Sequence, residues 1–371
     1  MLACDVIVVG GGPAGATCAW KLQCAGLDVV VLDRARFPRD KVCAGWITPQ
    51  VVAAAELDVD EYRRGRTFQA ITGFRAGLIG RASDTEVRYD HAVSFGIRRC
   101  EFDHYLLERS GARLELGAEM TGLRHDGRAW ILNDRFTAPM LVGAGGHFCP
   151  VARHLNPHVA NGPVVVAQEA EFPIDDDGGW TTVPETPELY FCGDLKGYGW
   201  CFRKQRYLNI GLGRLDPRSL PKATSQFVEF LRRRGTVPAD RPLRWRGHAY
   251  LVSAPPRRRV VGNGVLLVGD AAGLAYPSSG EGIRPAVESG VIAASTILAA
   301  TGVYSRGNLQ SYEEELCTRL DLKSGARQTP AWRQALAAAV APWLFGAKWF
   351  VRQQILDQWF LRREDPPLRG I

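Results

Sequence analysis

The chain has 371 residues, of which 46% are hydrophobic and 23% charged, and its formal net charge at pH 7 is +7. This length exceeds what one hydrophobic core usually supports, so we expect two or more lobes of a globular protein. No stretch approaches 18 uninterrupted apolar residues, so no transmembrane helix is predicted. The positive charge is compatible with an anionic substrate, an acidic redox partner, a membrane surface or a plain bias toward arginine. No DNA- or RNA-binding signature accompanies it, so we expect no nucleic acid partner.

The nine cysteines are an odd number and contain no Cys-x-x-Cys pair. Such spacing fits neither a disulfide framework nor a zinc or iron–sulfur site, so we expect no metal. A reducing cytoplasm is the simplest location for such a chain.

The N-terminal segment has the pattern of a dinucleotide-binding unit. We predict a buried strand over Asp5–Val9, a helix over Pro13–Ala25 and a second strand over Asp28–Asp33. Glycines in GxGxxG spacing stand between the first strand and the helix: Gly10, Gly12 and Gly15. The second strand ends on an acidic residue 18 positions after the last of these glycines, which completes the context that the fingerprint requires.

Each part of this unit has a physical task. Gly10 permits a tight turn, Gly12 lets the backbone approach a pyrophosphate, and Gly15 lets helix and strand pack closely. The helix N-terminus offers free N–H groups to phosphates, and Asp33 would accept hydrogen bonds from ribose hydroxyls. The unit does not distinguish FAD from NAD. Its candidate cofactor-binding residues are Gly10, Gly12, Pro13, Ala14, Gly15, Asp33 and Arg34.

Two further signals lie far along the chain. Arg99-Cys-Glu-Phe-Asp103 stands at the head of a predicted helix, and a buried strand beginning at Gly264 ends in Gly269-Asp270. With the first unit, these segments resemble the flavoprotein group that includes p-hydroxybenzoate hydroxylase and the geranylgeranyl reductases. The resemblance covers roughly residues 4–300 and implies FAD as the cofactor.

The resemblance also implies roles for these residues. Arg99 would contact the FAD phosphates and the ribitol side, and Asp270, after Gly269, would bind the ribityl hydroxyls. The turn Gly280-Glu-Gly282-Ile283 would place a helix N-terminus beside the flavin pyrimidine. A helix dipole there stabilises negative charge on the reduced flavin.

The loop from Phe37 to Pro49 is similar to a Lys-x-Cys-Gly-type stretch of the geranylgeranyl reductases that approaches the flavin. This similarity implies that Cys43 and Ala44 lie near the isoalloxazine, with Lys41 and Arg39 at the entrance. The alternative for Cys43 is a small buried hydrophobe.

Residues 197–202 are similar to the Tyr-x-Trp-x-Phe-Pro element that lines the substrate cavity of these reductases. By this similarity Tyr198 and Trp200 are candidate active-site residues; plain core packing is the alternative. Arg203 replaces the proline, and a buried guanidinium there would need an anionic or hydrogen-bonding partner. A purely hydrocarbon tunnel is therefore in doubt.

A second departure lies at residues 143–147, where Gly145 stands in place of the aspartate of hydroxylase relatives. Arg153 follows at the position of the group's distal arginine. The missing carboxylate argues against an aromatic hydroxylase and leaves the electron donor open, with NAD(P)H or another reductant as the expectation.

The predicted fold class is α/β, with a Rossmann-like FAD-binding domain, an antiparallel-sheet substrate domain and a helical C-terminus. The predicted limits are 1–70, 95–160 and 250–305 for the discontinuous FAD-binding domain, 71–94 and 161–249 for the substrate domain, and 306–371 for the helical region. The last region mixes tryptophans with basic residues. That pattern suits packing against the lobes or across a dimer, a roof over a lipophilic cavity, or peripheral contact with a membrane.

These signals together predict an FAD-dependent oxidoreductase. The resemblance favours hydride transfer from reduced flavin to a carbon–carbon double bond of an isoprenoid or other lipophilic substrate, with Cys43, Tyr198 or an ordered water as proton donor. The alternatives are a flavin-dependent monooxygenase or halogenase, a dehydrogenase that passes electrons to a quinone or other carrier, and a flavin-bound scaffold or sensor. The tryptophan-halogenase WxWxIP signature is missing. The sequence does not determine the oligomeric state.

Overall fold

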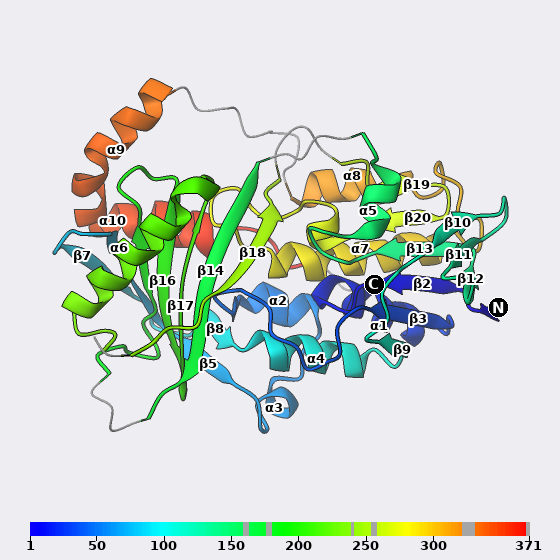
Figure 1. Ribbon diagram of the computed structural model, residues 1–371, viewed down its shortest axis with the longest axis horizontal. Coiled ribbons are helices and arrows are strands. Elements are labelled where there is room, and N and C mark those ends of the chain that lie inside the picture. Colours follow the sequence, from blue (N-terminus) through cyan, green and yellow to red (C-terminus); the bar gives the residue numbers. More distant parts are fainter. Residues whose placement is uncertain (159–162, 176–179, 239–240, 254–257, 321–330, 369–371) are drawn as a thin grey trace.

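The computed structural model describes residues 1–371 except 159–162, 176–179, 239–240, 254–257, 321–330 and 369–371, and of residues 331–335 it describes the backbone alone. Two large sheets stand side by side (Figure 1). The sheet with the N-terminal strands lies at one end of the molecule, and a seven-stranded sheet lies at the other.

The first large sheet carries the N-terminal βαβ unit. Its strand order is β19-β20-β13-β2-β3-β9, and every neighbouring pair is parallel except β19–β20. The strands are Val6–Val9 (β2), Val29–Asp33 (β3), Arg113–Leu116 (β9), Met140–Gly143 (β13), Val261–Gly262 (β19) and Val265–Leu267 (β20). The central strand β2 is buried at every position, which is why its sequence is a run of β-branched residues and not an alternation.

Three helices pack together beside this sheet: α1 (Pro13–Cys24), α4 (Arg99–Arg109) and α7 (Ile283–Ala299). Helix α1 contacts both of the others. It begins at Pro13 as predicted, and Gly26, at φ 87°, follows its end in the left-handed region that stops a helix. The short helices of this half are α2 (Pro49–Ala54), α3 (Val59–Tyr62), α5 (Pro150–Leu155) and the 3-10 turn η2 (Gly269–Ala271).

Two small sheets complete the framework. The four-stranded sheet has the order β1-β12-β11-β10, and the three-stranded sheet has the order β4-β8-β5. Their strands are Leu2–Ala3 (β1), Trp46–Ile47 (β4), Phe68–Ile71 (β5), Ser94–Ile97 (β8), Leu123–His125 (β10), Trp130–Leu132 (β11) and Phe136–Ala138 (β12).

The seven-stranded sheet has the order β18-β14-β17-β16-β15-β6-β7. Its strands are Gly73–Leu78 (β6), Asp84–Arg88 (β7), Val164–Pro173 (β14), Glu188–Phe191 (β15), Gly197–Lys204 (β16), Tyr207–Arg214 (β17) and Arg246–Leu251 (β18). The predicted α/β architecture is observed, with one difference: β15 and β6 run parallel, so the second sheet is mixed and not wholly antiparallel. Except for the last two residues of β18, the strands come from the segments expected for a substrate domain, whose exact limits remain a prediction.

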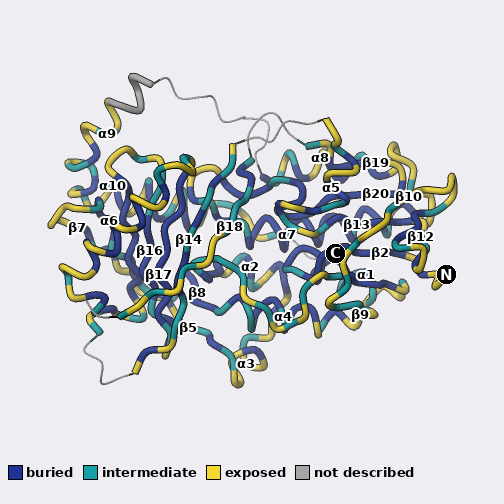
Figure 2. Tube along the Cα trace, viewed as in Figure 1, coloured by how far each residue is buried: buried dark blue, intermediate teal, exposed yellow. Residues whose placement is uncertain are grey.

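The two faces of this sheet bury different cores. Helix α6 (Leu220–Arg233), which follows the 3-10 turn η1 (Pro217–Ser219), covers one face through residues such as Phe227 and Leu231. The other face carries Phe74, Leu189 and Trp200, and the C-terminal helices cover part of it. Figure 2 shows the central strands of both sheets as buried.

The C-terminal region is helical, as predicted: α8 (Gln310–Arg319), α9 (Ala331–Gly346), α10 (Lys348–Phe350) and the π-helix η4 (Val351–Phe360). Phe345, Ile355 and Phe360 from this region are buried against the seven-stranded sheet, whereas Trp343 and Trp349 are exposed. The side chain of Trp332 lies outside the described residues. In the described part of the chain no helix is both long and apolar enough to cross a bilayer.

Candidate active site

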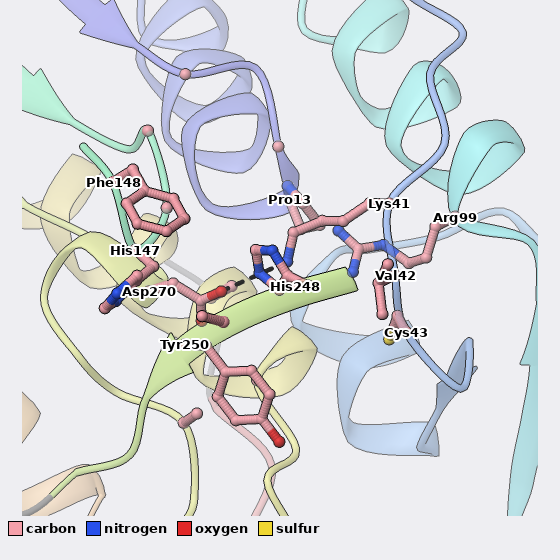
Figure 3. A pocket seen from close by; sticks show the side chains of 18 of the residues that line it. Pro13, Lys41, Val42, Cys43, Arg99, His147, Phe148, His248, Tyr250 and Asp270 are labelled. Carbon is pink, nitrogen blue, oxygen red and sulfur yellow. Dashed lines mark hydrogen bonds and ion pairs between the residues drawn. The ribbon is translucent and has the colours of Figure 1, made fainter. Parts of the chain in front are cut away.

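A cavity of about 970 Å³ lies between the two large sheets. Its wall combines the loop between β2 and α1, the loop that carries Cys43, and the start of α4 with parts of β14, β16 and β18 and the turn before α7. Figure 3 shows residues from several of these distant segments pointing into the same space.

Glycines shape the end of the cavity formed by the N-terminal unit. A Cβ on Gly10, at φ 116°, would lie 2.3 Å from the carbonyl oxygen of Ala144, and one on Gly15 would lie 2.0 Å from the carbonyl oxygen of Gly10. Side chains at these two positions are excluded by packing. A Cβ on Gly12 would meet nothing nearer than Arg39, at 3.5 Å, so this glycine leaves room for a ligand to approach the backbone.

The polar groups at this end suit the nucleotide half of a cofactor. Helix α1 begins after Gly12 without a side-chain cap, which leaves its N-terminus to a phosphate. The Asp33 carboxylate accepts hydrogen bonds from the backbone N–H groups of Gly11 and Ala35, both at 2.8 Å. These bonds hold the carboxylate beside Arg34 on the cavity wall, where it can accept further bonds from ribose hydroxyls.

Arg99 and Asp103 form a buried ion pair at the head of α4. The guanidinium donates to both carboxylate oxygens at 2.8 Å, and Arg39 Nη1 lies 3.1 Å from Asp103 Oδ2. Burial opposes both charges, but Asp103 and the Cys43 thiol raise the pKa of Arg99, and Arg99 and Arg39 lower that of Asp103. Two guanidinium groups thus face one carboxylate, so a net positive charge remains for an anionic group of the cofactor.

Lys41, Asp270 and His248 meet in the middle of the cavity (Figure 3). Lys41 Nζ lies 3.5 Å from Asp270 Oδ2, a distance that leaves the carboxylate free to bind hydroxyl groups. Burial and the charge of Lys41 lower the pKa of His248 to about 3, so the imidazole is neutral. Its Nε2 has no hydrogen-bond partner among the described residues.

The turn before α7 closes the opposite end. Gly280, at φ 69°, contacts the Tyr250 hydroxyl so closely that a Cβ would lie 2.2 Å from its oxygen. Glu281 lines the cavity and accepts a 2.7 Å hydrogen bond from the Arg284 N–H, and burial raises the pKa of its carboxyl to about 7. Helix α7 begins at Ile283, after Gly282, with its N-terminus at the cavity wall as the resemblance implied.

The three predicted catalytic residues lie on the same cavity. Cys43 is half-buried, and its Sγ accepts a 3.4 Å hydrogen bond from the Gly45 N–H. The Tyr198 hydroxyl donates to the carbonyl of Ser279, and burial places its pKa well above the ordinary value. The Trp200 indole N–H donates to Asn209 Oδ1 at 2.7 Å.

The expectation that Arg203 bears on the substrate cavity is wrong. Arg203 is only partly buried, its Nε donates to the Gln205 carbonyl, and it is not among the residues of the cavity wall. The alternation of strand β16 turns the next residue, Lys204, inward instead. Lys204 is 1% exposed and pairs with Glu171 at 2.9 Å.

Of the predicted catalytic and cofactor-binding residues, only Gly15 and Gly269 lie off the cavity wall. Both stand behind it, where a Cβ would contact backbone or the neighbouring helix. The wall also contains residues that the prediction did not include: Met120, His147, Phe148, Arg246, His248, Tyr250 and Glu281. For β18 a signal exists, since Arg246, His248 and Tyr250 alternate along one strand.

The donor set fits FAD along its length. The uncapped N-terminus of α1, the glycine that leaves the backbone open and the Asp33 carboxylate suit the nucleotide end. Asp270 and the α7 N-terminus suit a ribityl chain and a flavin ring. Within the described residues no three His, Cys, Asp or Glu side chains are placed to hold a metal ion.

Comparison with known proteins identifies the family. Residues 3–320 match the model of the FAD binding domain family. The geranylgeranyl diphosphate reductase of Rhodobacter capsulatus is 31% identical over 317 residues, covering 80% of this chain and 75% of that protein. The menaquinone reductase of Mycolicibacterium smegmatis is 31% identical over 323 residues, covering 78% and 75%.

A solved structure has the same fold. It is a geranylgeranyl bacteriochlorophyll reductase-like protein from Thermoplasma acidophilum, with a TM-score of 0.77, 19% identity and 98% of each chain covered. The fold and the cavity that fits FAD are consistent with the family of these relatives. The chain belongs to the geranylgeranyl reductase family of FAD-binding flavoproteins and is an FAD-dependent oxidoreductase.

Proposed function

We propose that this protein reduces carbon–carbon double bonds in the isoprenoid chain of a lipophilic substrate. The observation that carries the proposal is the division of one cavity into a polar and an aromatic part. Trp46, Tyr198 and Trp200 line the aromatic part, and Phe360 packs on the first two at ring-centroid distances of 5.5 and 5.2 Å. An apolar chain held there would lie next to the segments proposed for the flavin.

We propose that FAD lies along the polar part of the cavity. The N-terminus of α1 and Arg99 would hold the FAD phosphates, Asp33 the adenosine ribose, and Asp270 the ribityl hydroxyls. The N-terminus of α7 would face the flavin pyrimidine and favour negative charge on it. FAD, when bound, supplies hydride chemistry, and the residues around it orient the alkene and exclude water.

Cys43 is our candidate for the proton donor. Its thiol lies on the cavity wall, whereas the Tyr198 hydroxyl already donates to a backbone carbonyl and has a strongly raised pKa. Tyr198 and Trp200 are better suited to shape the substrate wall. We propose NAD(P)H or another reductant as the electron donor, which anaerobic flavin bleaching by each candidate would identify.

The two relatives named above are a reductase of geranylgeranyl diphosphate and a reductase of menaquinone. Both compounds carry a polyprenyl chain, and we extend that substrate class to this protein. The test is anaerobic reduction of the flavin followed by addition of geranylgeranyl diphosphate or menaquinone. Mass spectrometry should find two added hydrogens on the polyprenyl chain for each reduced bond. With menaquinone the ring is first reoxidised to the quinone, because reduction of the ring to the quinol also adds two hydrogens. Product formed only in the presence of oxygen, with oxygen incorporated, would instead establish a monooxygenase.

We also propose that the C-terminal helices contact a membrane surface. Leu336, Val340 and Trp343 are 57%, 39% and 83% exposed, and their i, i+4, i+7 spacing places them on one side of α9. Trp349, 63% exposed, follows in α10. Residues 331–356 contain three basic residues and no acidic one. An exposed apolar face with tryptophan and positive charge suits the interface of an anionic bilayer.

Cosedimentation with vesicles tests this contact. Wild-type protein should bind vesicles that contain phosphatidylglycerol more strongly than phosphatidylcholine vesicles, and Trp343→Ala/Trp349→Ala should lose most of the binding. The control Leu215→Ala/Val303→Ala removes two exposed apolar side chains elsewhere and should bind as wild type. Equal binding by both double variants would contradict the proposal, as would a tryptophan-dependent dimer that binds no vesicles.

A further inference from the structure

The backbone of Cys43 is held by side chains that come from the seven-stranded sheet. Glu169 on β14 accepts a 2.6 Å hydrogen bond from the Cys43 N–H through Oε2. Asn209 on β17 donates to the Cys43 carbonyl through Nδ2 at 3.2 Å. Both polar backbone groups of this residue are therefore bonded to side chains that follow it by 126 and 166 residues in the sequence.

The same loop is confined two residues later. Gly45 adopts φ 68°, and a Cβ there would lie 2.3 Å from Lys204 Nζ and 2.4 Å from the Ile97 carbonyl oxygen. Lys204 is fixed in turn by Glu171, at 2.9 Å. The loop thus passes between the seven-stranded sheet and β8 with no room for a side chain at this position.

Asn209 links the loop to the aromatic wall of the cavity. Its Oδ1 accepts the indole N–H of Trp200 at 2.7 Å, while its Nδ2 bonds Cys43. The Trp200 ring lies against Gly211, where a Cβ would be only 2.1 Å from it. One buried amide therefore sets the position of the thiol-bearing loop relative to the indole.

Stability alone does not account for these polar groups. Glu169 is 5% exposed and Asn209 is 1% exposed, and burial raises the pKa of the Glu169 carboxyl to about 7. Burying a carboxylate carries a desolvation cost that an apolar side chain of similar volume would avoid. Ala167 and Glu169 are two residues apart on β14, so their side chains lie on the same face of the strand, and Ala167 lines the cavity.

We propose that Glu169 and Asn209 are positioning residues that set the place of the Cys43 thiol relative to the substrate wall. On this proposal the seven-stranded sheet, through these two side chains, holds the backbone that carries the thiol. The importance of this arrangement for turnover rests on the proposed function, in which Cys43 faces the substrate, but the arrangement itself can be tested without a substrate.

The test is the rate at which iodoacetamide alkylates Cys43 in the FAD-loaded protein, followed by peptide mass spectrometry. Loss of one hydrogen bond should loosen the loop, so Glu169→Ala and Asn209→Ala should each alkylate about fivefold to tenfold faster than wild type. Glu169→Gln keeps an oxygen acceptor for the Cys43 N–H and should restore a rate close to that of wild type. The exposed Cys24 serves as an internal reference with an unchanged rate.

Glu188→Ala is the matched control. Glu188 is equally buried, at 4% exposed, and lies in the same sheet, but it pairs with Arg75 and Tyr190 away from the Cys43 loop. Its removal should leave the Cys43 rate unchanged. Equal acceleration in this control would mean that general loosening of the sheet is responsible and would overturn the proposal.

Glu169→Leu covers the case in which Glu169→Ala does not fold. It keeps most of the side-chain volume but removes the acceptor for the Cys43 N–H, so faster alkylation of Cys43 is again expected. Wild-type rates in every folded variant that removes one of the two hydrogen bonds to Cys43 would overturn the positioning role even if the protein reduces alkenes. Accelerated alkylation would support it even if the substrate proves to be of another class.

Discussion

At the scale of single residues, burial and neighbouring charges together set the charge of the cavity. Asp103 is fully buried, yet two arginines keep its pKa low and the carboxylate ionised. Glu281 is also buried but has a weaker set of partners, so its pKa rises to about 7. His248 is held neutral by burial beside Lys41. A neutral imidazole and a carboxyl that titrates near neutral pH therefore lie on the same wall as the permanent charges.

The raised pKa of Glu281 predicts a pH-dependent effect on stability. Folded protein keeps this proton between the ordinary pKa of 4.5 and about 7, so Glu281 lowers the free energy of unfolding as pH rises through that window. The full difference corresponds to about 3 kcal/mol. Glu281→Gln should therefore be more stable than wild type by a few kcal/mol at pH 8 and by much less at pH 5.

Urea denaturation of both proteins at the two pH values measures this difference. Glu315→Gln, an exposed position on α8, is the control and should change stability little at either pH. An advantage of Glu281→Gln that is the same at pH 5 and pH 8 would contradict the assignment.

At the scale of elements, two glycines on one strand differ in the space that they leave for a side chain. Gly211 and Gly213 both lie on β17 and face the same side, two residues apart. A Cβ on Gly211 would lie 2.1 Å from the Trp200 ring, whereas one on Gly213 would lie no closer than 3.6 Å to any neighbour. The packing of the indole therefore requires glycine at the first position and not at the second.

Gly211→Ala should displace Trp200 and lower the free energy of unfolding by about 1–3 kcal/mol, because the rigid ring must shift within a packed wall. Gly213→Ala should be neutral or slightly stabilising, by up to about 1 kcal/mol, since it restricts the unfolded chain. Thermal unfolding with near-ultraviolet circular dichroism checks both effects. Equal stability and unchanged aromatic signal in the two variants would show that the indole does not lie across β17.

The elements that sequence reasoning could predict are those with local causes. The GxGxxG turn, the helix from Pro13 and the strand that ends at Asp33 follow from glycine geometry, proline preference and burial of a β-branched run. The α7 N-terminus followed from a family resemblance in the turn before it. The residues predicted from these local signals and from the resemblance mostly line one cavity.

What the sequence could not provide depends on contacts between distant strands. Glu169 and Asn209 reach Cys43 only because β14 and β17 pair in one register and lie against the loop. The parallel pairing of β15 with β6 likewise has no local signal.

At the scale of the whole molecule, a buried ion network joins the cavity to the C-terminus. Glu288 on α7 accepts hydrogen bonds from Arg284 at 2.9 Å and from Arg319 of α8 at 2.6 and 2.9 Å. Arg284 Nη2 also lies 3.5 Å from Asp365, beyond the last helix. Helix α7, which begins at the proposed flavin end of the cavity, is therefore linked by ion pairs both to α8 and to Asp365.

Glu288→Ala should be strongly destabilising, by about 3–5 kcal/mol, because it leaves the buried guanidinium of Arg284 and the partly buried one of Arg319 short of a partner. Limited proteolysis should then cut the region after residue 305 faster than in wild type. Glu315→Gln on the exposed side of α8 again serves as the control. Unchanged unfolding and proteolysis in Glu288→Ala would show that the network does not hold the C-terminal region in place.

We propose that the distant segments at Gly12, Asp33, Arg99 and Asp270 act as one FAD site. Calorimetric titration of FAD into apoprotein tests it most directly, with Asp33→Ala, Arg99→Ala and Asp270→Ala compared with wild type and with Leu215→Ala as the surface control. Each of the three should weaken FAD binding by about tenfold or more, as expected when a charge-assisted hydrogen bond is lost, and the control should bind as wild type. Wild-type affinity in all three folded variants would contradict the account.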